Sequence, residues 1–378
     1  MTKFDKTDLL ITIANIDCNS SLENFLPLYE HNMILDNDRF LILGKSGSGK
    51  TCIFDLLNSS NGRIALTRSL KIKHLPLGNT TWISGYGGKT KLSYPEALGE
   101  HMKDESKNSW RSIWIGLMLS KIFELPNFPG NWAKEVPYHV RDCLVNNFSL
   151  FTIWLKYINS EFEDINYALD KLDEELLASN RWLFITYDEL DTIVPYSELT
   201  KPISELLSFW LDRWRRWERI RPKIFLNTDL FQSEFRGFQD ASKLVSHQVT
   251  LKWSSNLSWQ LLLKHLANSN QEMYDYLKVI PGLINPYADY ELGRLPSSIE
   301  YHFQLFTEKM MGKYMKGRKP STYYWICNNI PSIRPESFLK FFSLAAKSRL
   351  KKGNIEKLPK NQLLDPTDLR SALVSMNL

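Results

Sequence analysis

The sequence predicts an α/β fold in which helices cover both faces of a parallel sheet, with a helical insertion and a C-terminal helical domain added. Three short apolar runs indicate the sheet: Phe40–Leu43, Trp182–Tyr187 and Lys223–Leu226. A parallel strand buried on both faces shows continuous apolar character instead of alternation, as these runs do. Longer stretches with apolar residues at three- and four-residue spacing are typical of helices.

The order of these elements predicts three parts. Helical patterns between the first two strands occur at Ser109–Leu125, Tyr138–Ile158 and Glu161–Ser179. They return after Trp253 at Leu257–Asn268, Ser298–Tyr314, Thr322–Ile330 and Pro335–Arg349, and a short helix is expected to begin near Pro366. We therefore expect a core at 1–70 and 180–253, a helical insertion at 71–179, and a lid-like C-terminal helical domain at 254–378.

The composition is that of a globular protein and excludes several classes. The 378 residues are 43% hydrophobic and carry a mild formal charge of +5, which permits contact with nucleic acid without indicating it. Four cysteines without a Cys-x-x-Cys pair indicate neither a disulfide framework nor a zinc site. The first residues lack the layout of a signal peptide, and the apolar runs are too short to cross a bilayer. We expect a soluble, cytoplasmic protein.

A glycine-rich segment follows the first strand directly. Residues 44–51 read Gly-Lys-Ser-Gly-Ser-Gly-Lys-Thr, and a helical stretch begins at Cys52. This is the complete P-loop (Walker A) pattern in its strand–loop–helix context, so the core is predicted to be that of a P-loop nucleoside triphosphatase. Its backbone amides and the following helix N-terminus would bind phosphate. The predicted nucleotide-binding residues are Gly44, Lys45, Ser46, Gly47, Ser48, Gly49, Lys50, Thr51 and Cys52.

The second predicted strand ends in Asp188-Glu189-Leu190-Asp191, which supplies the acidic partner (Walker B) of such a loop. Lys50 is expected to reach the β- and γ-phosphates, while Thr51 and Asp188 would hold Mg²⁺. Glu189 would orient and polarise the attacking water. Asp191 is either a supporting partner of these groups or an exposed carboxylate at the start of a helix.

The third predicted strand ends in Asn227-Thr228-Asp229. Asn227 is our candidate for sensing the γ-phosphate or orienting the water, with Thr228 and Asp229 as alternatives. The competing interpretation is a strand end capped by ordinary Asn-Thr-Asp turn chemistry.

With these strands in order, the chain resembles the AAA+/STAND-like P-loop ATPases, particularly a bacterial group found with defence genes, over nearly its whole length. The resemblance rests on the Asp-Glu-Leu-Asp ending at Asp188–Asp191, the polar and Phe-rich run from Asn227 to Phe238, and Leu251-Lys-Trp253. The family's Pro-Arg pair at a late helix stands here in reverse order, as Arg334-Pro335, so a sensor-2 role does not carry over directly to Arg334.

The same resemblance to oligomeric ATPases implies that Arg236 is a candidate arginine finger that reaches a neighbouring subunit's nucleotide. The alternative for an isolated loop arginine is a surface ion pair.

Two basic stretches suggest nucleic acid as a partner. Phe209–Lys223 interleaves three tryptophans with five arginines, a pattern that either stacks on bases or forms an amphipathic helix that covers the sheet. Its position between two core strands favours the covering helix. The run Lys347–Lys352, with Lys357 and Lys360 beyond it, either contacts nucleic acid or an acidic partner, or is simply solvated.

The sequence therefore predicts an ATPase that uses ATP and Mg²⁺ and acts as a nucleotide-driven switch. The family resemblance implies a role in bacterial anti-phage defence, either as a homo-oligomer or with a separately encoded effector protein. Two alternatives stay open: a motor or loader that handles DNA or RNA, and a scaffold that binds ATP without hydrolysing it. The seven histidines have no metal-ligand spacing.

Overall fold

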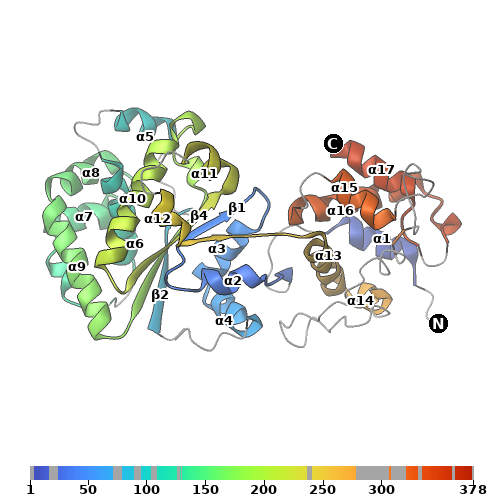
Figure 1. Ribbon diagram of the computed structural model, residues 1–378, viewed down its shortest axis with the longest axis horizontal. Helices are drawn as coiled ribbons and strands as arrows, with labels where there is room; N and C mark the ends of the chain where they lie inside the picture. The colour runs from blue at the N-terminus through green and yellow to red at the C-terminus, as the bar shows by residue number, and fades with distance from the viewer. Residues whose placement is uncertain are drawn as a thin grey trace.

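The protein has two lobes, a larger one built around a sheet and a smaller helical one that contains both ends of the chain (Figure 1). This computed structural model describes residues 4–16, 24–70, 79–88, 95–103, 109–125, 128, 130–235, 241–277, 306–307, 321–330, 334–359 and 362–376. Arg236, Lys360 and most of the helix expected at 298–314 lie outside the described residues. No helix in the described part of the chain combines the length and apolar character needed to span a membrane.

A five-stranded, entirely parallel sheet forms the centre of the larger lobe, in the order β2-β3-β4-β1-β5. The strands are β1 (Leu41–Gly44), β2 (Thr80–Tyr86), β3 (Trp182–Tyr187), β4 (Ile220–Asn227) and β5 (Gln248–Thr250). The three predicted strands and the α/β class are confirmed. Because all strands are parallel, the residues that follow β1, β3 and β4 meet at one edge of the sheet.

Helices cover both faces of the sheet, as predicted. Within β3, Phe184 belongs to one hydrophobic core, whereas Leu183 and Ile185 belong to the other. The first core contains α2 (Tyr29–Ile34), α3 (Lys50–Asn58) and α4 (Ser60–Ser69). The second contains α5 (Pro95–Met102), α6 (Trp110–Phe123), α7 (Tyr138–Asn146), α8 (Phe151–Ser160), α9 (Phe162–Ala178), α10 (Thr200–Arg216), α11 (Thr228–Glu234) and α12 (Ala241–Val245).

Two strands, β2 and β5, were not predicted. β2 lies inside the segment 71–179 that was expected to be a helical insertion, yet it pairs with β3 along its length and forms an edge of the sheet. It mixes polar and apolar residues and contains Gly85, and β5 has only three residues, so neither gives a continuous apolar run. The segment 71–179 is therefore not entirely a helical insertion, because β2 belongs to the sheet.

The single helix expected over Tyr138–Ile158 is two helices, α7 and α8, with a turn between them. The Phe148 carbonyl in this turn accepts a hydrogen bond from Trp154 Nε1 at 2.8 Å. The Trp154 ring packs so closely on α6 at Gly116 that a Cβ there would lie 2.4 Å from it. Trp154 is fully buried in α8, between the turn and α6.

The smaller lobe corresponds to the predicted C-terminal helical domain. It contains α1 (Lys6–Ala14), α13 (Ser255–Ser269), α14 (Gln271–Leu277), α15 (Thr322–Asn329), α16 (Pro335–Lys352) and α17 (Pro366–Ser375) around their own hydrophobic core. The N-terminal helix α1 packs on α16, where Ser343 Oγ donates to the Ala14 carbonyl at 2.6 Å. Residues 6–14 therefore pack with the C-terminal helices, although the sequence had grouped them with the core at 1–70.

Trp253 and Leu257 join the two lobes. Both pack against the core of the smaller lobe and also against the core on the α2–α4 face of the sheet. Trp253 lies on the connection that leaves β5 and enters α13, and Leu257 lies in the first turn of α13; Figure 1 shows this connection crossing from one lobe to the other.

Candidate functional site

The Gly44–Thr51 loop begins at the end of β1 and runs into the first turn of α3. Gly47 and Gly49 have φ values of +71° and +89°, a left-handed conformation that glycine adopts without the penalty that a Cβ brings. Gly49 is also the N-cap of α3. A loop with such residues that leads into a helix N-terminus forms a concave group of amides suited to an anion. The strand, the loop and the helix thus follow one another in the order that the glycine pattern predicted.

Lys50 lies among several charged side chains at this edge of the sheet. Its Nζ donates to the carbonyls of Gly44 at 2.9 Å and Lys45 at 3.1 Å. Burial lowers the pKa of Lys50, and the nearby carboxylates of Asp188, Asp191 and Asp229 oppose this shift. Lys50 thus lies close to the ends of both β3 and β4, and Asp191 is one of its charged neighbours.

Asp188 directly follows β3 and is only 4% exposed. Burial raises the pKa of Asp188 to about 6, against the opposing effect of a hydrogen bond from the Thr51 side chain. Its Oδ2 is buried without a hydrogen-bond partner. A buried carboxylate oxygen without a partner, beside a hydroxyl, suits a hard cation such as Mg²⁺.

A cation at this position would need further ligands. Among the described residues, no group of three or more His, Cys, Asp or Glu side chains could hold a metal ion by themselves. Mg²⁺ is commonly bound by one or two protein groups together with water and substrate phosphates. Thr51 and Asp188 fit that mode of binding.

Glu189 has an unusual backbone conformation, with φ 53° and ψ 31° in the left-handed region. Only two other non-glycine residues in the described part of the chain have a positive φ. Burial raises the pKa of Asp55 of α3, and the nearby charge of Glu189 raises it further. Asp55 comes one helical turn after Thr51, so these two side chains lie on the same side of α3.

Asn227 lies beside the loop, because it is the β4 neighbour of Gly44 in the sheet. Its Oδ1 accepts the backbone N–H of Asp229 at 2.8 Å and caps α11. The turn chemistry that competed with a catalytic role is therefore present. The Asp229 carboxylate lies near Lys50, so the end of β4 contributes charge to the site.

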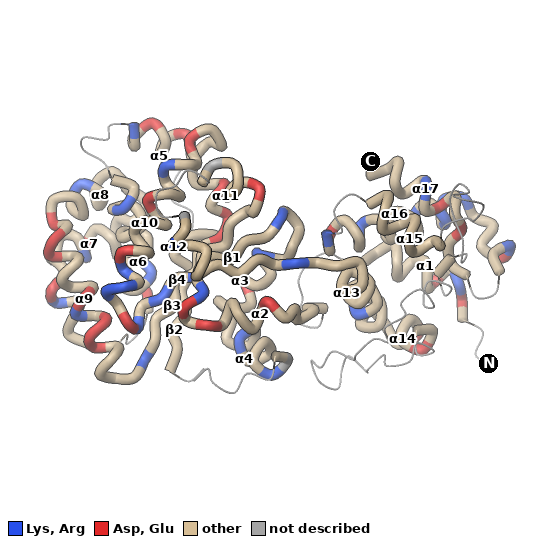
Figure 2. The backbone as a smooth tube through the Cα atoms, viewed as in Figure 1, with Lys and Arg blue, Asp and Glu red and all other residues tan. Residues whose placement is uncertain are grey.

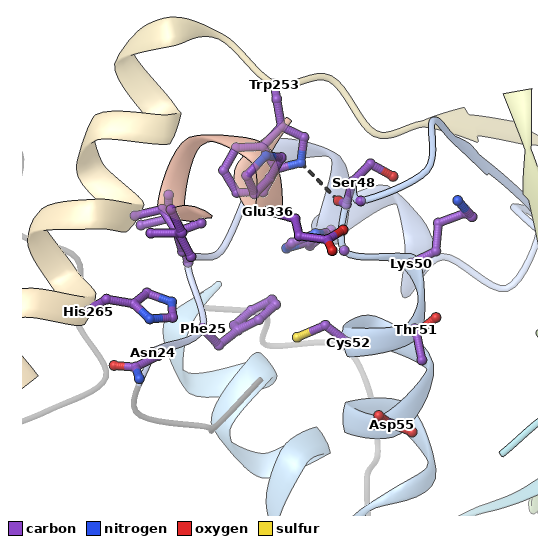
Figure 3. Close-up of a pocket in the computed structure, with 17 residues that line it drawn as sticks. Asn24, Phe25, Ser48, Lys50, Thr51, Cys52, Asp55, Trp253, His265 and Glu336 are labelled. Atoms are coloured by element: carbon purple, nitrogen blue, oxygen red, sulfur yellow. Dashed lines mark hydrogen bonds between the residues drawn. The ribbon is translucent and has the colours of Figure 1, made fainter. Parts of the chain in front are cut away.

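A pocket of about 460 Å³ opens beside the loop, between the two lobes, and lies in the size range of small-molecule sites. Figure 3 shows Phe25 and Cys52 side by side within it, with Asn24 and His265 on one side and Thr51 and Asp55 on the other. The pocket is lined by Asn24, Phe25, Leu26, His31, Gly47, Ser48, Gly49, Lys50, Thr51, Cys52, Asp55, Trp253, Leu261, His265, Pro335, Glu336 and Leu339.

His31 of α2 is one of the residues that line this pocket. Its Nδ1 accepts the Leu28 backbone N–H at 2.9 Å, and burial lowers the pKa of His31 to about 3. The ring is therefore neutral and carries its hydrogen on Nε2. It stacks on Phe25 with the ring centres 5.1 Å apart.

The N-terminus of α16 brings two charged residues of the smaller lobe to the loop. A Cβ on Gly47 would lie 2.8 Å from Glu336 Oε2 and 3.8 Å from Arg334 Cβ. The charge of Arg334 also acts on Lys50, whose pKa it lowers in addition to the effect of burial. The reversed Arg-Pro order thus still leaves Arg334 beside the loop.

Trp253 ties the connection between the lobes to the loop, because its Nε1 donates to the Ser48 carbonyl at 2.9 Å (Figure 3). Sequence reasoning missed Phe25, His31, Glu336 and Trp253 as residues of the site. Trp253 had a signal in the Leu-x-Trp pattern, and Glu336 directly follows the Arg334-Pro335 pair; Phe25 and His31 belong to no motif.

The first basic stretch is largely engaged within the protein, whereas the second keeps Lys347, Lys351 and Lys357 exposed. Trp210 of α10 and Trp217 at its C-terminal end are buried, and Arg216 pairs with Asp170 of α9. This confirms the covering helix. In the cluster on α16, Arg349 is buried and pairs with Asp368 of α17, and the exposed Lys352 pairs with the same carboxylate. Figure 2 shows positions of both charge signs spread over both lobes.

No protein-family model matches the chain, and no curated protein is similar to it. The assignment of function therefore rests on the geometry of this site and on the motifs.

Proposed function

We propose that the chain binds ATP with Mg²⁺ at the Gly44–Thr51 loop and hydrolyses it. The observation that carries the proposal is the meeting of Lys50, Thr51 and Asp188, whose Oδ2 has no hydrogen-bond partner, beside a left-handed glycine loop at one edge of the sheet. Loop amides and Lys50 suit the phosphates, because both are donors directed at an anion site.

The residues fit Mg²⁺, which would be held by the Thr51 hydroxyl and the Asp188 carboxylate and would neutralise charge on the phosphate oxygens. Lys50 would exchange its bonds to the Gly44 and Lys45 carbonyls for phosphate oxygens. Arg334 would add a second cation from the smaller lobe, since it lies beside the same loop.

Glu189 would orient a water molecule in line with the γ-phosphate and accept its proton. Phosphoryl transfer needs positioning and charge neutralisation more than covalent chemistry, so these few groups suffice. Asn227 is proposed to fix the relative position of the loop and the end of β4, through its cap on Asp229, and Asp229 to support Lys50.

The pocket next to the loop would take the nucleoside. Phe25 and Trp253 offer aromatic faces, Leu261 and Leu339 line it with apolar surface, and His31 offers an Nε2–H donor. A flat heterocycle with acceptor nitrogens matches this combination. Because the walls come from both lobes, nucleotide binding would fix the lobes relative to one another.

This arrangement supports a nucleotide-driven switch. The motif resemblance extends the proposal to a role in bacterial anti-phage defence, with a partner protein or further copies of the chain as the responding element. The Phe209–Lys223 stretch does not favour handling of nucleic acid, because Trp210 and Trp217 are buried and Arg216 pairs with Asp170 within the larger lobe.

Ligand-dependent thermal stabilisation tests the binding step. A ligand at one hundred times its Kd stabilises a protein by about 2.7 kcal/mol. We expect Mg·ATP to raise the Tm, inorganic tripolyphosphate to raise it less because it leaves the pocket empty, and Lys50→Ala to abolish both shifts. Lys347→Ala, at an exposed position of α16, serves as the control. An unchanged ATP shift in Lys50→Ala would contradict binding at this loop.

A further inference from the structure

The carbonyl of Glu189 is held from within its own turn. Thr192 Oγ1 donates to this carbonyl at 2.8 Å, and the Thr192 backbone N–H reaches it at 2.9 Å. These bonds close the short 3₁₀ turn Leu190–Thr192 onto Glu189 while Glu189 has left-handed dihedrals. A non-glycine residue keeps that conformation only where its surroundings impose it, and such residues cluster at functional sites.

Tyr86, at the end of β2, supports Thr192. The Tyr86 hydroxyl lies 3.1 Å from Thr192 Oγ1. Because the Thr192 hydroxyl hydrogen is already given to the Glu189 carbonyl, Tyr86 must be the donor in this contact. Two hydroxyls therefore form a chain that runs from the edge strand to the backbone of Glu189.

Tyr86 itself is rigidly placed. It is 3% exposed, and its ring meets that of Trp114 edge-on, with the centres 6.0 Å apart. Trp114 is a fully buried residue of α6, fixed by a 2.9 Å hydrogen bond from its Nε1 to the Pro202 carbonyl. The helices on this face of the sheet thus fix the position of the Tyr86 hydroxyl.

The backbone of β2 approaches the acidic strand end as well. The Asp188 N–H donates to the Tyr86 carbonyl at 3.0 Å. Gly87 has φ +107°, and a Cβ there would lie 2.9 Å from the Asp188 carbonyl oxygen. Side chain and backbone of the 86–87 segment therefore act on Asp188 and Glu189 together.

We infer that Tyr86 and Thr192 are positioning residues for hydrolysis, which hold Glu189 in its left-handed conformation and so aim its carboxylate at the water to be activated. The inference rests on the proposed ATPase function. Neither residue is proposed to contact the nucleotide, and both act through Glu189. Trp114 of α6 contacts Tyr86, so the helices on this face of the sheet are linked to Glu189 by a series of contacts.

Removal of each hydroxyl tests the inference. Tyr86→Phe and Thr192→Val should each lower the single-turnover rate of phosphate release by about 10- to 100-fold, since misplacement of a catalytic group by about 1 Å has effects of this size. The Kd for Mg·ATP should stay within about twofold of the wild-type value, because neither residue contacts the nucleotide. Thr192→Ser keeps the hydroxyl and should restore most of the rate. Tyr138→Phe, at an exposed position of α7, is the matched control.

A double variant separates this role from general damage. In a Glu189→Gln background, Thr192→Val should lower the remaining rate no further, because both changes remove the same function. Should Thr192→Val fail to fold, Tyr86→Phe carries the test alone, since its ring still packs on Trp114. Wild-type rates in both single variants, or independent effects in the double variant, would overturn the inference while leaving the ATPase proposal intact. A wild-type chain without turnover dependent on Glu189 would overturn both.

Discussion

Lys223 is a charged side chain at the centre of the sheet, with no exposed surface. Its Nζ donates to the carbonyls of Asp36 at 2.6 Å and Arg39 at 2.8 Å, and it lies 5.7 Å from the Phe184 ring centre. Burial lowers the pKa of Lys223 to about 7, and the charges of Asp36 and Asp38 only partly oppose this. The residue ties the segment that leads into β1, and hence into the loop, to β4.

This burial predicts a pH dependence of stability. The pKa of Lys223 is about 7 in the folded chain and about 10.4 for an unperturbed lysine. Between these values the unfolded chain binds more protons, so the free energy of unfolding rises with pH across this window. Below pH 7 both states are protonated and the penalty of the buried charge is fully present.

Urea unfolding between pH 6 and pH 9 checks this prediction. The wild-type protein should gain stability above pH 7 relative to Lys223→Met, whose side chain has similar length and no charge. Lys347→Met, at an exposed site, should follow the wild-type curve. Parallel curves for wild type and Lys223→Met would show that this lysine does not titrate as its burial implies.

At the scale of elements, a polar bridge fixes α3 against the sheet. Asn58 Nδ2, at the end of α3, donates to Thr186 Oγ1 at 2.8 Å, and this hydroxyl lies 3.1 Å from the Ile83 carbonyl of β2. Thr186 has no exposed surface. Because α3 carries Thr51 and β3 leads to Asp188, the bridge sets the distance between the two proposed Mg²⁺ ligands.

Thr186→Val should therefore destabilise the protein by about 1–3 kcal/mol, the usual effect of leaving buried partners without their hydrogen bonds. It should also weaken the Mg²⁺ dependence of ATP binding, measured as the ratio of the Kd values with and without the ion. Thr186→Ser keeps the hydroxyl and should lose only about 0.8 kcal/mol for its missing methyl group. An equal loss in both variants would assign the effect to packing alone.

The elements also show what the sequence could predict. β1, β3 and β4 were recognised because both of their faces are buried, which leaves a continuous apolar run. β2 is an edge strand with mixed polarity, and its membership of the sheet depends on pairing with β3, which no local pattern reveals. The break between α7 and α8 depends on the space left by Gly116 for Trp154, again a property of packing.

The candidate site was predictable where it is local in sequence. The Gly44–Thr51 loop and Asp188-Glu189 were recognised because each is a contiguous sequence pattern that directly follows a predicted strand. Asn227 was recognised as a strand-end residue, and the structure adds its cap on Asp229. Phe25, His31 and Glu336 could not be predicted, because tertiary packing brings them to the pocket: Phe25 and His31 from the segment before β1, and Glu336 from the smaller lobe.

At the scale of the whole molecule, the site lies where the two lobes meet. Trp253 and Leu257 pack on the cores of both lobes, and Lys264 of α13 donates to the Phe25 carbonyl at 2.5 Å. A nucleotide between the loop, Phe25 and the start of α16 would contact both lobes at once. The presence or loss of the γ-phosphate would then change the contacts that fix the two lobes relative to one another. This change is the physical basis of the proposed switch.

The most direct test of the account measures ATP turnover and ATP affinity together, in the wild-type chain and in Glu189→Gln. We predict Mg²⁺-dependent hydrolysis by the wild type. The variant should bind ATP with an unchanged Kd and retain it, with turnover lower by at least about 100-fold, the usual contribution of a general base. Turnover that survives the substitution would contradict the role of Glu189, and tight ATP binding without hydrolysis by the wild type would identify a nucleotide-binding scaffold instead of an ATPase.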